Sequence, residues 1–370
     1  MQNTTSGSRL ITTSLLTLYG GTYSLTCLND ITDMLHEAET ELQRFRWILA
    51  AVLGAAVAAT AALSVYMTRP LRRISRTARQ LAAGQTDRRV TVRTDDELGD
   101  LAQNFNAMAD ALEARLLVAY AVGKTKEEFV RDLRLYTSDE NEQKIAALLQ
   151  RRIAGEPLAY LIGEWEFHGL PIVVTPDVLI PRMDTEVLVD AALHVLVGRK
   201  MNARILDLCS GSGCIGCALA HELPAARVVM VDISDEALTV SKENLRRNHQ
   251  NRTICLKADA LAKPPMGIGT FDLIVSNPPY VASMDILTLD SSVRDYEPLG
   301  ALDGGEDGLM FYRAIIRHWT QILRPGGWLM FEVGEDQADA VMALMKEEKY
   351  TDVTALEDTA GIRRVVVGRI

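Results

Sequence analysis

The longest apolar run in this chain spans residues 47–68, a stretch of 22 residues without a charged side chain. Two arginines precede the run and five follow it, at positions 44, 46, 69, 72, 73, 76 and 79. A helix of this length crosses the hydrocarbon core of a bilayer, and the heavier downstream arginine load places the C-terminal side in the cytoplasm. A secretory signal peptide would be shorter and closer to Met1. The pattern predicts a transmembrane helix, with a buried alanine-rich helix of a soluble protein as the alternative.

Residues 1–46 carry a weaker pattern ahead of this run. Leu10 to Leu18 and Thr22 to Leu28 alternate in polarity on either side of Gly20-Gly21, which predicts a β-hairpin. A helix from about Asp30 would then lead into the apolar run. If residues 47–68 cross the membrane, residues 1–46 are expected to be extracytoplasmic.

Residues 69–113 predict two amphipathic helices joined by a connector. Apolar positions such as Ile74, Ala78 and Phe105 recur at helical spacing, and the second helix follows the element Asp95-Asp96-Glu97-Leu98-Gly99. This combination resembles a HAMP linker, a family that forms a parallel dimeric four-helix coiled coil below the membrane. The resemblance implies homodimerisation through this segment. An ordinary charged helical hairpin is the alternative.

The remainder of the chain alternates strand and helix patterns. Residues 204–208 and 227–231 predict buried strands on either side of a glycine loop and a helix from about Cys214 through Glu222. Further strands are predicted over 253–257 and 271–275. Such an order is typical of an open α/β sheet of parallel strands, which binds its ligand at the carboxyl ends of the strands.

Acidic and glycine residues cluster at those predicted strand ends. Gly211, Gly213 and Gly216 form a nucleotide-binding glycine pattern, and Asp232 ends the next strand. Asp207 precedes the loop, where a carboxylate suits a cationic amino or sulfonium group better than a pyrophosphate. This placement favours S-adenosylmethionine (AdoMet) over NAD. Asp259 could accept from an adenine amino group, and helix capping is the alternative role for both Asp207 and Asp259.

The run 271–275 leads into the tetrapeptide Asn277-Pro278-Pro279-Tyr280. An amide or ring-amino nitrogen delocalises its lone pair, so an enzyme that methylates it must hold its N–H groups with acceptors. The Asn277 side-chain oxygen and the Pro278 carbonyl can accept these bonds, while the prolines stiffen the loop and Tyr280 offers a flat wall. A Pro-Pro turn that merely closes a strand is the alternative.

Residues from about 113 to 370 resemble the HemK-type (PrmC-like) N5-glutamine methyltransferases of peptide-chain release factors. The resemblance rests on an ordered set of segments besides the tetrapeptide. They are Pro157-Leu158-Ala159-Tyr160-Leu161-Ile162-Gly163, Glu166-Phe167-His168-Gly169-Leu170, Val178-Leu179-Ile180-Pro181-Arg182-Met183-Asp184-Thr185-Glu186, Tyr296-Glu297-Pro298, residues 301–309 and residues 358–366. The family departs from this chain at Cys209 and Met183, where many members have glycine and proline.

The resemblance implies a Rossmann-like AdoMet-dependent methyltransferase fold with a small helical N-terminal domain. It implies that Asp207, Gly211 and Gly213 line the methionine part of the cofactor, that Asp232 binds the ribose hydroxyls, and that Asp259 lies near the adenine. Asn277 to Tyr280 would hold the glutamine amide of the release factor's Gly-Gly-Gln loop. A shortened docking domain would occupy residues 114–163 and the catalytic domain residues 164–370.

Composition adds few candidates to this picture. A net charge of -10 and a pI near 5.2 argue against broad binding to a phosphate backbone, so a nucleic acid partner is not expected. Cys209, Cys214 and Cys217 have the spacing of plant-type iron–sulfur ligands, but small side chains that pack behind a glycine loop explain them better. We therefore predict no metal site and reduced cytoplasmic thiols.

Three function classes follow from these patterns. The first is a protein-glutamine methyltransferase attached to the cytoplasmic membrane, and it is the one that we predict. The second is a membrane signalling or anchoring protein that carries a passenger methyltransferase domain; the N-terminal part resembles a truncated two-component sensor, but no kinase motifs follow the linker. The third is a nucleic-acid adenine N6-methyltransferase, which shares the Asn-Pro-Pro-Tyr element.

Overall fold

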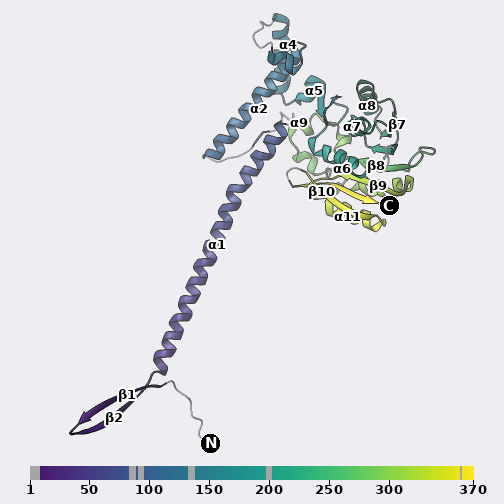
Figure 1. Cartoon of the computed structure of the whole chain (residues 1–370). Helices are drawn as coiled ribbons and strands as arrows, with labels where there is room; N and C mark the ends of the chain where they lie inside the picture. The colour runs from purple at the N-terminus through teal and green to yellow at the C-terminus, as the bar shows by residue number, and fades with distance from the viewer. Residues whose placement is uncertain (1–8, 83–88, 91–95, 132–137, 197–201, 359–360) are drawn as a thin grey trace. The chain divides into compact units, whose positions relative to one another are not determined.

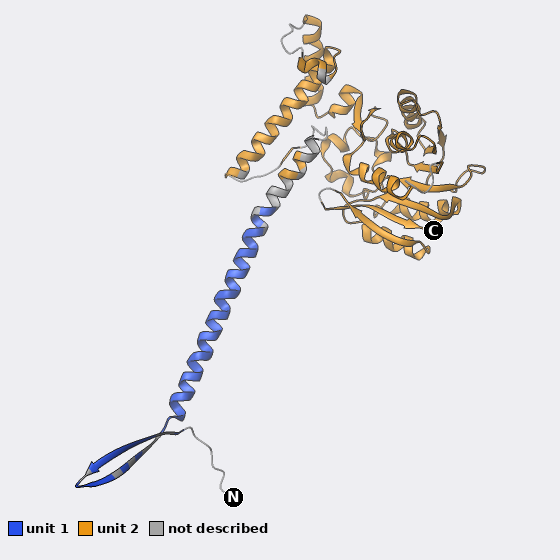
Figure 2. Cartoon of the chain, in the orientation of Figure 1, with its two compact units in different colours: residues 1–71 blue, residues 72–370 orange. Residues whose placement is uncertain are grey.

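The computed structural model describes residues 9–82, 89–90, 96–131, 138–196, 202–358 and 361–370. The chain divides into two compact units, Met1–Leu71 and Arg72–Ile370 (Figure 2). Each unit has its own secondary structure, and the two are described separately below.

The first unit contains the predicted hairpin and most of a long helix. Strands β1 (Arg9–Leu18) and β2 (Gly21–Asp30) pair antiparallel with Leu18 opposite Gly21. The turn lies at Tyr19 and Gly20, with φ of 50° and 78°, one residue before the predicted Gly20-Gly21 turn. Two consecutive residues with positive φ match the twist of a two-residue hairpin. The prediction of a hairpin is correct, and its turn position is wrong by one residue.

Helix α1 (Thr32–Ala82) follows the hairpin as one continuous helix (Figure 1). Asp30 caps its start, because the Thr32 N–H donates to Asp30 Oδ1 at 3.0 Å. Within the described residues, the stretch Thr32–Ser64 is the one helix long and apolar enough to cross a membrane. The predicted apolar run 47–68 therefore lies inside a longer helix that continues past residue 68 without a break.

The second unit begins with the end of α1 and a group of shorter helices. Helix α2 spans Glu97–Ala121, α3 Lys126–Arg131, α4 Asp139–Ile153 and α5 Leu158–Ile162. Asp95 of the predicted acidic element lies outside the described residues. The predicted domain boundary at residue 113 falls in the middle of α2, which runs through it.

Two small apolar clusters share helix α2. Its first half buries Ala102, Phe105 and Ala109 against Ile74 and Val90. The second half buries other residues against α4 and α5, namely Leu117, Ala121, Leu148, Leu158 and Leu161. Helix α2 therefore belongs to both predicted segments, because its first half lies in residues 69–113 and its second half in residues 114–163.

The largest part of the second unit is a seven-stranded sheet with the strand order β10-β11-β9-β8-β5-β6-β7. The strands are β5 (Arg204–Leu208), β6 (Arg227–Asp232), β7 (Thr253–Lys257), β8 (Phe271–Ser276), β9 (Leu323–Glu332), β10 (Thr351–Glu357) and β11 (Arg363–Arg369). Strands β5 to β9 pair in parallel, as predicted for the first four. Strands β10 and β11 add an antiparallel edge that the sequence patterns did not reveal.

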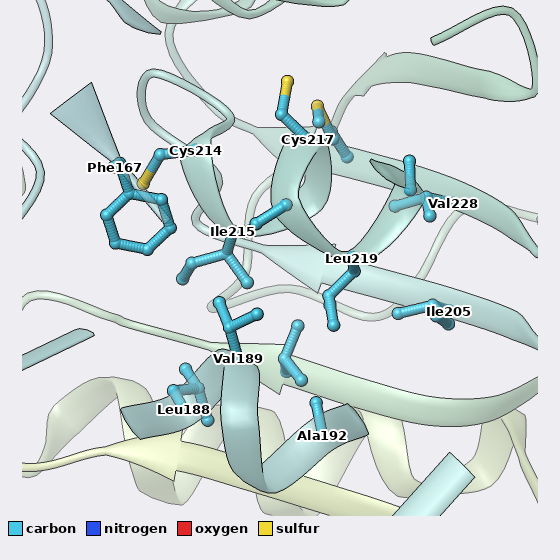
Figure 3. Close-up of a cluster of buried hydrophobic side chains, with 14 of the residues drawn as sticks. Phe167, Leu188, Val189, Ala192, Ile205, Cys214, Ile215, Cys217, Leu219 and Val228 are labelled. Atoms are coloured by element: carbon cyan, nitrogen blue, oxygen red, sulfur yellow. The ribbon is translucent and has the colours of Figure 1, made fainter. Parts of the chain in front are cut away.

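Helices cover both faces of this sheet. Helices α6 (Glu186–Leu196), α7 (Cys214–Glu222) and α8 (Asp235–Arg247) contribute to one buried cluster, and α10 (Met310–Trp319) and α11 (Ala338–Glu347) to the other. Figure 3 shows part of the first cluster, where Ile215 and Leu219 of α7 lie among Val189 of α6 and Ile205 of β5. A short hairpin of β3 (Glu164–Phe167) and β4 (Leu170–Val173) precedes α6. The open α/β sheet predicted from the sequence is confirmed, with an antiparallel edge added to its parallel strands.

Candidate functional site

A cavity of about 280 Å³ opens at the carboxyl ends of β5, β6, β7 and β8. Parallel strands present their last residues at the same edge, which is where an open α/β sheet binds its ligand. Five of the predicted site residues line this cavity, namely Gly211, Asp232, Asp259, Asn277 and Pro279. Four others, Asp207, Gly213, Pro278 and Tyr280, are not among its lining residues.

The glycine loop after β5 is held by the carboxylate that ends β6. Gly211 adopts φ 52° and donates its N–H to Asp232 Oδ2 at 2.8 Å, while the Ser234 N–H donates to Asp232 Oδ1 at 3.0 Å. Two backbone donors therefore fix the Asp232 carboxylate at the cavity wall. Each of its oxygens keeps a lone pair that can accept a further hydrogen bond.

Gly213 contributes close packing rather than cavity surface. It has φ 77° at the N-cap of α7, and a Cβ there would lie 2.9 Å from both Met230 Sδ and Ser241 Oγ. A Cβ at Gly216 would lie 2.4 Å from Met230 Cε. The two glycines let α7 begin directly against β6, a close approach that larger residues would prevent.

Asp207 lies beneath the loop and is completely buried. The Gly216 N–H donates to its Oδ2 at 2.9 Å, whereas its Oδ1 has no hydrogen-bond partner among the described residues. Burial raises the pKa of Asp207 to about 7, with the nearby Asp232 charge acting in the same direction. The contact at the start of α7 is the helix-capping role that the sequence left open. Contact of Asp207 with the methionine part of a cofactor stays a prediction.

Asp259 lies on the cavity wall beyond β7. Its Oδ1 accepts the Leu261 N–H at 2.8 Å, and Ala260 and Leu261 line the cavity beside it. The bond is a local turn contact that orients the carboxylate. Asp259 is therefore held in place through one of its two carboxylate oxygens.

The Asn-Pro-Pro-Tyr loop follows β8, with Asn277 and Pro279 on the cavity wall. The Asn277 side chain donates from Nδ2 to Thr185 Oγ1 at 3.4 Å. The Tyr280 carbonyl accepts from Gln337 Nε2 at 2.9 Å, so the residue that precedes α11 anchors the end of the loop. The Tyr280 ring packs on the buried cluster of α10 and α11, and burial raises the pKa of its hydroxyl to about 12.

Several residues near the cavity carried no role in the sequence analysis. Thr185 and Arg182 line the cavity, and Arg182 pairs with the buried Glu297. Glu332 ends β9 with a buried carboxyl whose pKa burial raises to about 7. One signal could have identified Glu332: it is an acid directly after an apolar strand, like Asp232.

Four cysteines of the described residues are free thiols, and no group of histidine, cysteine or acidic residues within the described ranges could hold a metal ion. Cys209 lines the cavity with φ 63°, a conformation that suits glycine better than a residue with a Cβ. Burial raises the pKa of Cys214 to about 12 and that of Cys255 to about 11. Raised values keep these thiols protonated and unreactive.

Three family models match the chain in succession. The HAMP domain matches residues 62–114, the PrmC N-terminal domain residues 102–163, and the Methyltransferase small domain residues 184–290. The first two matches overlap along helix α2.

Curated relatives match the second unit over much of their length. A release factor glutamine methyltransferase from Geobacter sulfurreducens is 46% identical over 233 residues, which cover 62% of this chain and 80% of the relative. One from Clostridium botulinum is 37% identical over 70% of this chain and 91% of the relative. Among solved structures, a release factor-specific protein-(glutamine-N5) methyltransferase from Alicyclobacillus acidocaldarius is 30% identical, with 53% of this chain and 97% of that chain covered and a TM-score of 0.33.

Proposed function

The chain belongs to the family of release factor glutamine methyltransferases, and from this premise we propose that it methylates the side-chain amide of the glutamine in a release factor's Gly-Gly-Gln loop, with AdoMet as the methyl donor. The observation that carries the proposal is the cavity that brings Asp232, Asp259 and Asn277 together at the ends of adjacent strands. Residues 164–370 would form the catalytic domain and residues 114–163 the docking domain.

The residues present fit AdoMet. The buried Asp207 has an oxygen without a partner among the described residues, directly beneath the glycine loop, as a cationic amino acid moiety requires. Asp232 can accept from ribose hydroxyls with its remaining lone pairs, and Asp259 can accept from an adenine amino group. When bound, AdoMet supplies an electrophilic methyl group on a sulfonium.

Asn277 and Pro278 hold the acceptor nitrogen in this proposal. The amide N–H groups of the substrate glutamine donate to Asn277 Oδ1 and to the Pro278 carbonyl, which keeps the nitrogen lone pair aimed at the donor. The rigid Pro-Pro segment and the Gln337 anchor at Tyr280 maintain this arrangement. The extra proton on the methylated nitrogen leaves to water.

The test is transfer of labelled methyl groups from AdoMet to a purified release factor by the full-length protein in detergent. We expect transfer to the wild-type Gly-Gly-Gln loop and none to a loop whose glutamine is replaced. Replacing Asn277 by Ala should abolish transfer while AdoMet binding is retained. Label on DNA or RNA, with none on the release factor, would instead favour the adenine methyltransferase alternative.

We further propose that the protein is anchored in the cytoplasmic membrane through residues 47–68, with residues 1–46 outside the cytoplasm and the catalytic domain inside it. Helix α1 is apolar over a sufficient length, its large apolar side chains there are exposed, and the HAMP match begins at residue 62, near the end of the apolar run. Residues 69–113 would form a parallel dimer. We expect the protein to stay in the membrane fraction after a carbonate wash. We also expect the catalytic domain to be protected from added protease in sealed right-side-out vesicles.

A further inference from the structure

Resting on the proposed use of AdoMet, we propose that Ser241 and Asn244 are positioning residues for the cofactor. Both lie on helix α8, three residues apart, and therefore on the same face of that helix. Both side chains are completely buried. They hold two cavity-lining residues of the glycine loop, Gly211 and Ser212, in the conformation that receives the cofactor.

The two side chains bind consecutive carbonyl groups of the loop. Ser241 Oγ donates to the Gly211 carbonyl at 2.8 Å, and Asn244 Nδ2 donates to the Ser212 carbonyl at 2.9 Å. The Gly211 N–H is bound to Asp232 at 2.8 Å, so both polar groups of this residue are engaged. A glycine backbone has more accessible conformations than any other, and bonds from outside the loop select one of them.

The Asn244 amide also binds the start of a second wall of the cavity. Its Nδ2 donates to the Val173 carbonyl at 3.0 Å, and its Oδ1 accepts the Val173 N–H at 2.7 Å. Val173 ends β4, and the chain that follows it lines the cavity at several positions between Asp177 and Arg182. Both amide hydrogens and the amide oxygen are in use, which fixes the orientation of the side chain. One buried residue therefore connects the glycine loop to a second cavity-lining segment.

The expected effect of these bonds is on cofactor affinity. If the loop adopts its binding conformation for only a fraction of the time, the apparent Kd rises by the inverse of that fraction. The bonds from α8 raise this fraction before the cofactor arrives. Ser241 and Asn244 are not among the cavity-lining residues, so neither needs to touch the cofactor. Steps that follow cofactor binding should not depend on them.

The first experiment measures AdoMet binding to full-length protein in detergent by calorimetry. Ser241→Ala removes one hydroxyl and preserves the helix, because alanine is a strong helix former. We expect it to raise the Kd for AdoMet by about fivefold, which corresponds to one net hydrogen bond. Transfer at saturating AdoMet should keep kcat and the KM for release factor within about twofold of wild type. A lower kcat with an unchanged Kd would indicate a merely structural role and overturn the proposal.

Thr239→Ala is the control for loss of a hydroxyl from α8. The exposed Thr239 Oγ1 donates to the Asp235 carbonyl of its own helix at 2.8 Å. We expect this variant to bind AdoMet within about twofold of wild type. A rise in Kd equal to that of Ser241→Ala would contradict the role of the bond to Gly211.

A second pair of variants separates the loop from the β3–β4 hairpin. Asn248, which follows α8, donates to the Pro171 carbonyl of this hairpin at 3.1 Å and has no bond to the glycine loop among the described residues. We expect Asn244→Ala to raise the Kd for AdoMet by at least about tenfold and Asn248→Ala by less than about twofold. Equal rises would assign the effect to the hairpin and overturn the proposal.

Hydrogen exchange of the ligand-free protein supplies a readout that does not depend on activity. The Gly211 and Gly213 N–H groups are both hydrogen-bonded, so their exchange reports opening of the loop. We expect these amides to exchange about fivefold faster in Ser241→Ala, with the amides of β9 unchanged. Unchanged exchange in the loop would refute the positioning role. Wild-type protein that binds no AdoMet would overturn this role and the proposed cofactor together, whereas AdoMet binding without transfer to release factor would count against the proposed substrate alone.

Discussion

At the residue scale, the two buried carboxyl groups set the balance between stability and chemistry. Asp207 and Glu332 are both almost inaccessible, and desolvation is the largest cause of the raised pKa of each. Desolvation favours the protonated acid, whereas the bond from the Gly216 N–H to Asp207 and the charges of Arg364 and Arg182 near Glu332 favour the carboxylate. The site thus holds acids that are ionised only at some cost in folding free energy.

Glu332→Gln should make the stability of the ligand-free protein less dependent on pH. The pKa of Glu332 rises from an ordinary 4.5 to about 7 on folding, so the folded state binds the proton more tightly. Its stabilising contribution is complete below about pH 4.5 and is lost as pH rises through about 7. Thermal unfolding at pH 5 and pH 8 should show a smaller loss for the variant, by at most on the order of 3 kcal/mol. The effect of Asp207 is common to both proteins and cancels.

If the stability of the two proteins depended equally on pH, the pKa of Glu332 would not be strongly raised in the folded state.

Gly308→Ala should damage methyl transfer more than a comparable substitution elsewhere. Gly308 has φ 71°, and a Cβ there would lie 2.4 Å from the Tyr280 carbonyl oxygen at the end of the Asn-Pro-Pro-Tyr loop. Gly163→Ala is the matched control, with φ 76° and open space around the new Cβ. Both variants carry the backbone penalty of about 1 kcal/mol, but only Gly308→Ala must displace the loop. We expect at least a tenfold larger loss of kcat/KM for Gly308→Ala, measured with release factor.

Similar losses in the two variants would mean that the backbone conformation, rather than contact with Tyr280, explains the need for glycine.

At the element scale, the outcome of sequence reasoning depended on how local its signals were. Strands β5 to β8 were predicted because each is a short, mainly apolar run, and β6 and β8 lead directly to Asp232 and Asn277. The same rule applies to Glu332, but a Pro-Gly-Gly segment inside β9 obscured the strand. Thr185 could not be linked to Asn277, which is 92 positions away in sequence. Only the folded chain brings the short helix η1 (Met183–Thr185) beside the loop after β8.

The domain boundaries were the least predictable elements. The boundary at residue 113 was placed where the HAMP-like resemblance ends and the methyltransferase resemblance begins, and α2 runs through it with different clusters packed on its two halves. Periodicity reports which face is buried and carries no information on the partner.

Glu113 is a nearly buried charged residue of α2 that lies between Ala109 of the first cluster and Leu117 of the second. It is 7% exposed, and it bonds to Arg152 of α4 at 3.1 Å and pairs with Arg89 of the connector at 3.2 Å. Glu113→Ala should lower the free energy of unfolding by about 3 kcal/mol, because it leaves two arginines without their shared partner. The exposed Asp110, which also pairs with Arg89, provides the control, and Asp110→Ala should cost less than about 1 kcal/mol. Chemical denaturation of the detergent-solubilised protein measures both.

Equal effects of the two substitutions would indicate that Glu113 does not join the connector to α4.

At the scale of the whole molecule, the chain combines a long helix that contains an apolar stretch with an α/β methyltransferase fold. The apolar cluster of Leu117, Ala121, Leu148, Leu158 and Leu161 contains no described residue of the first unit. Removal of residues 1–95 should therefore leave methyl transfer within about fivefold of the full-length value, because α2 would begin at its natural start. Labelled transfer to release factor by the two proteins tests this expectation. A loss beyond a hundredfold would show that the N-terminal part is required for activity.

The continuity of α2 also has a geometric consequence for the junction between the two modules. An α-helix turns by about 100° and advances by about 1.5 Å for each residue. Inserting one residue between Ala109 and Leu117 would thus rotate the face that holds Leu117 by more than a quarter turn relative to the face that holds Phe105, whereas inserting seven would nearly restore the angle. The continuous helix therefore fixes the rotation of one half of α2 relative to the other. Insertions of seven residues should be tolerated better than insertions of one residue, although they add more length.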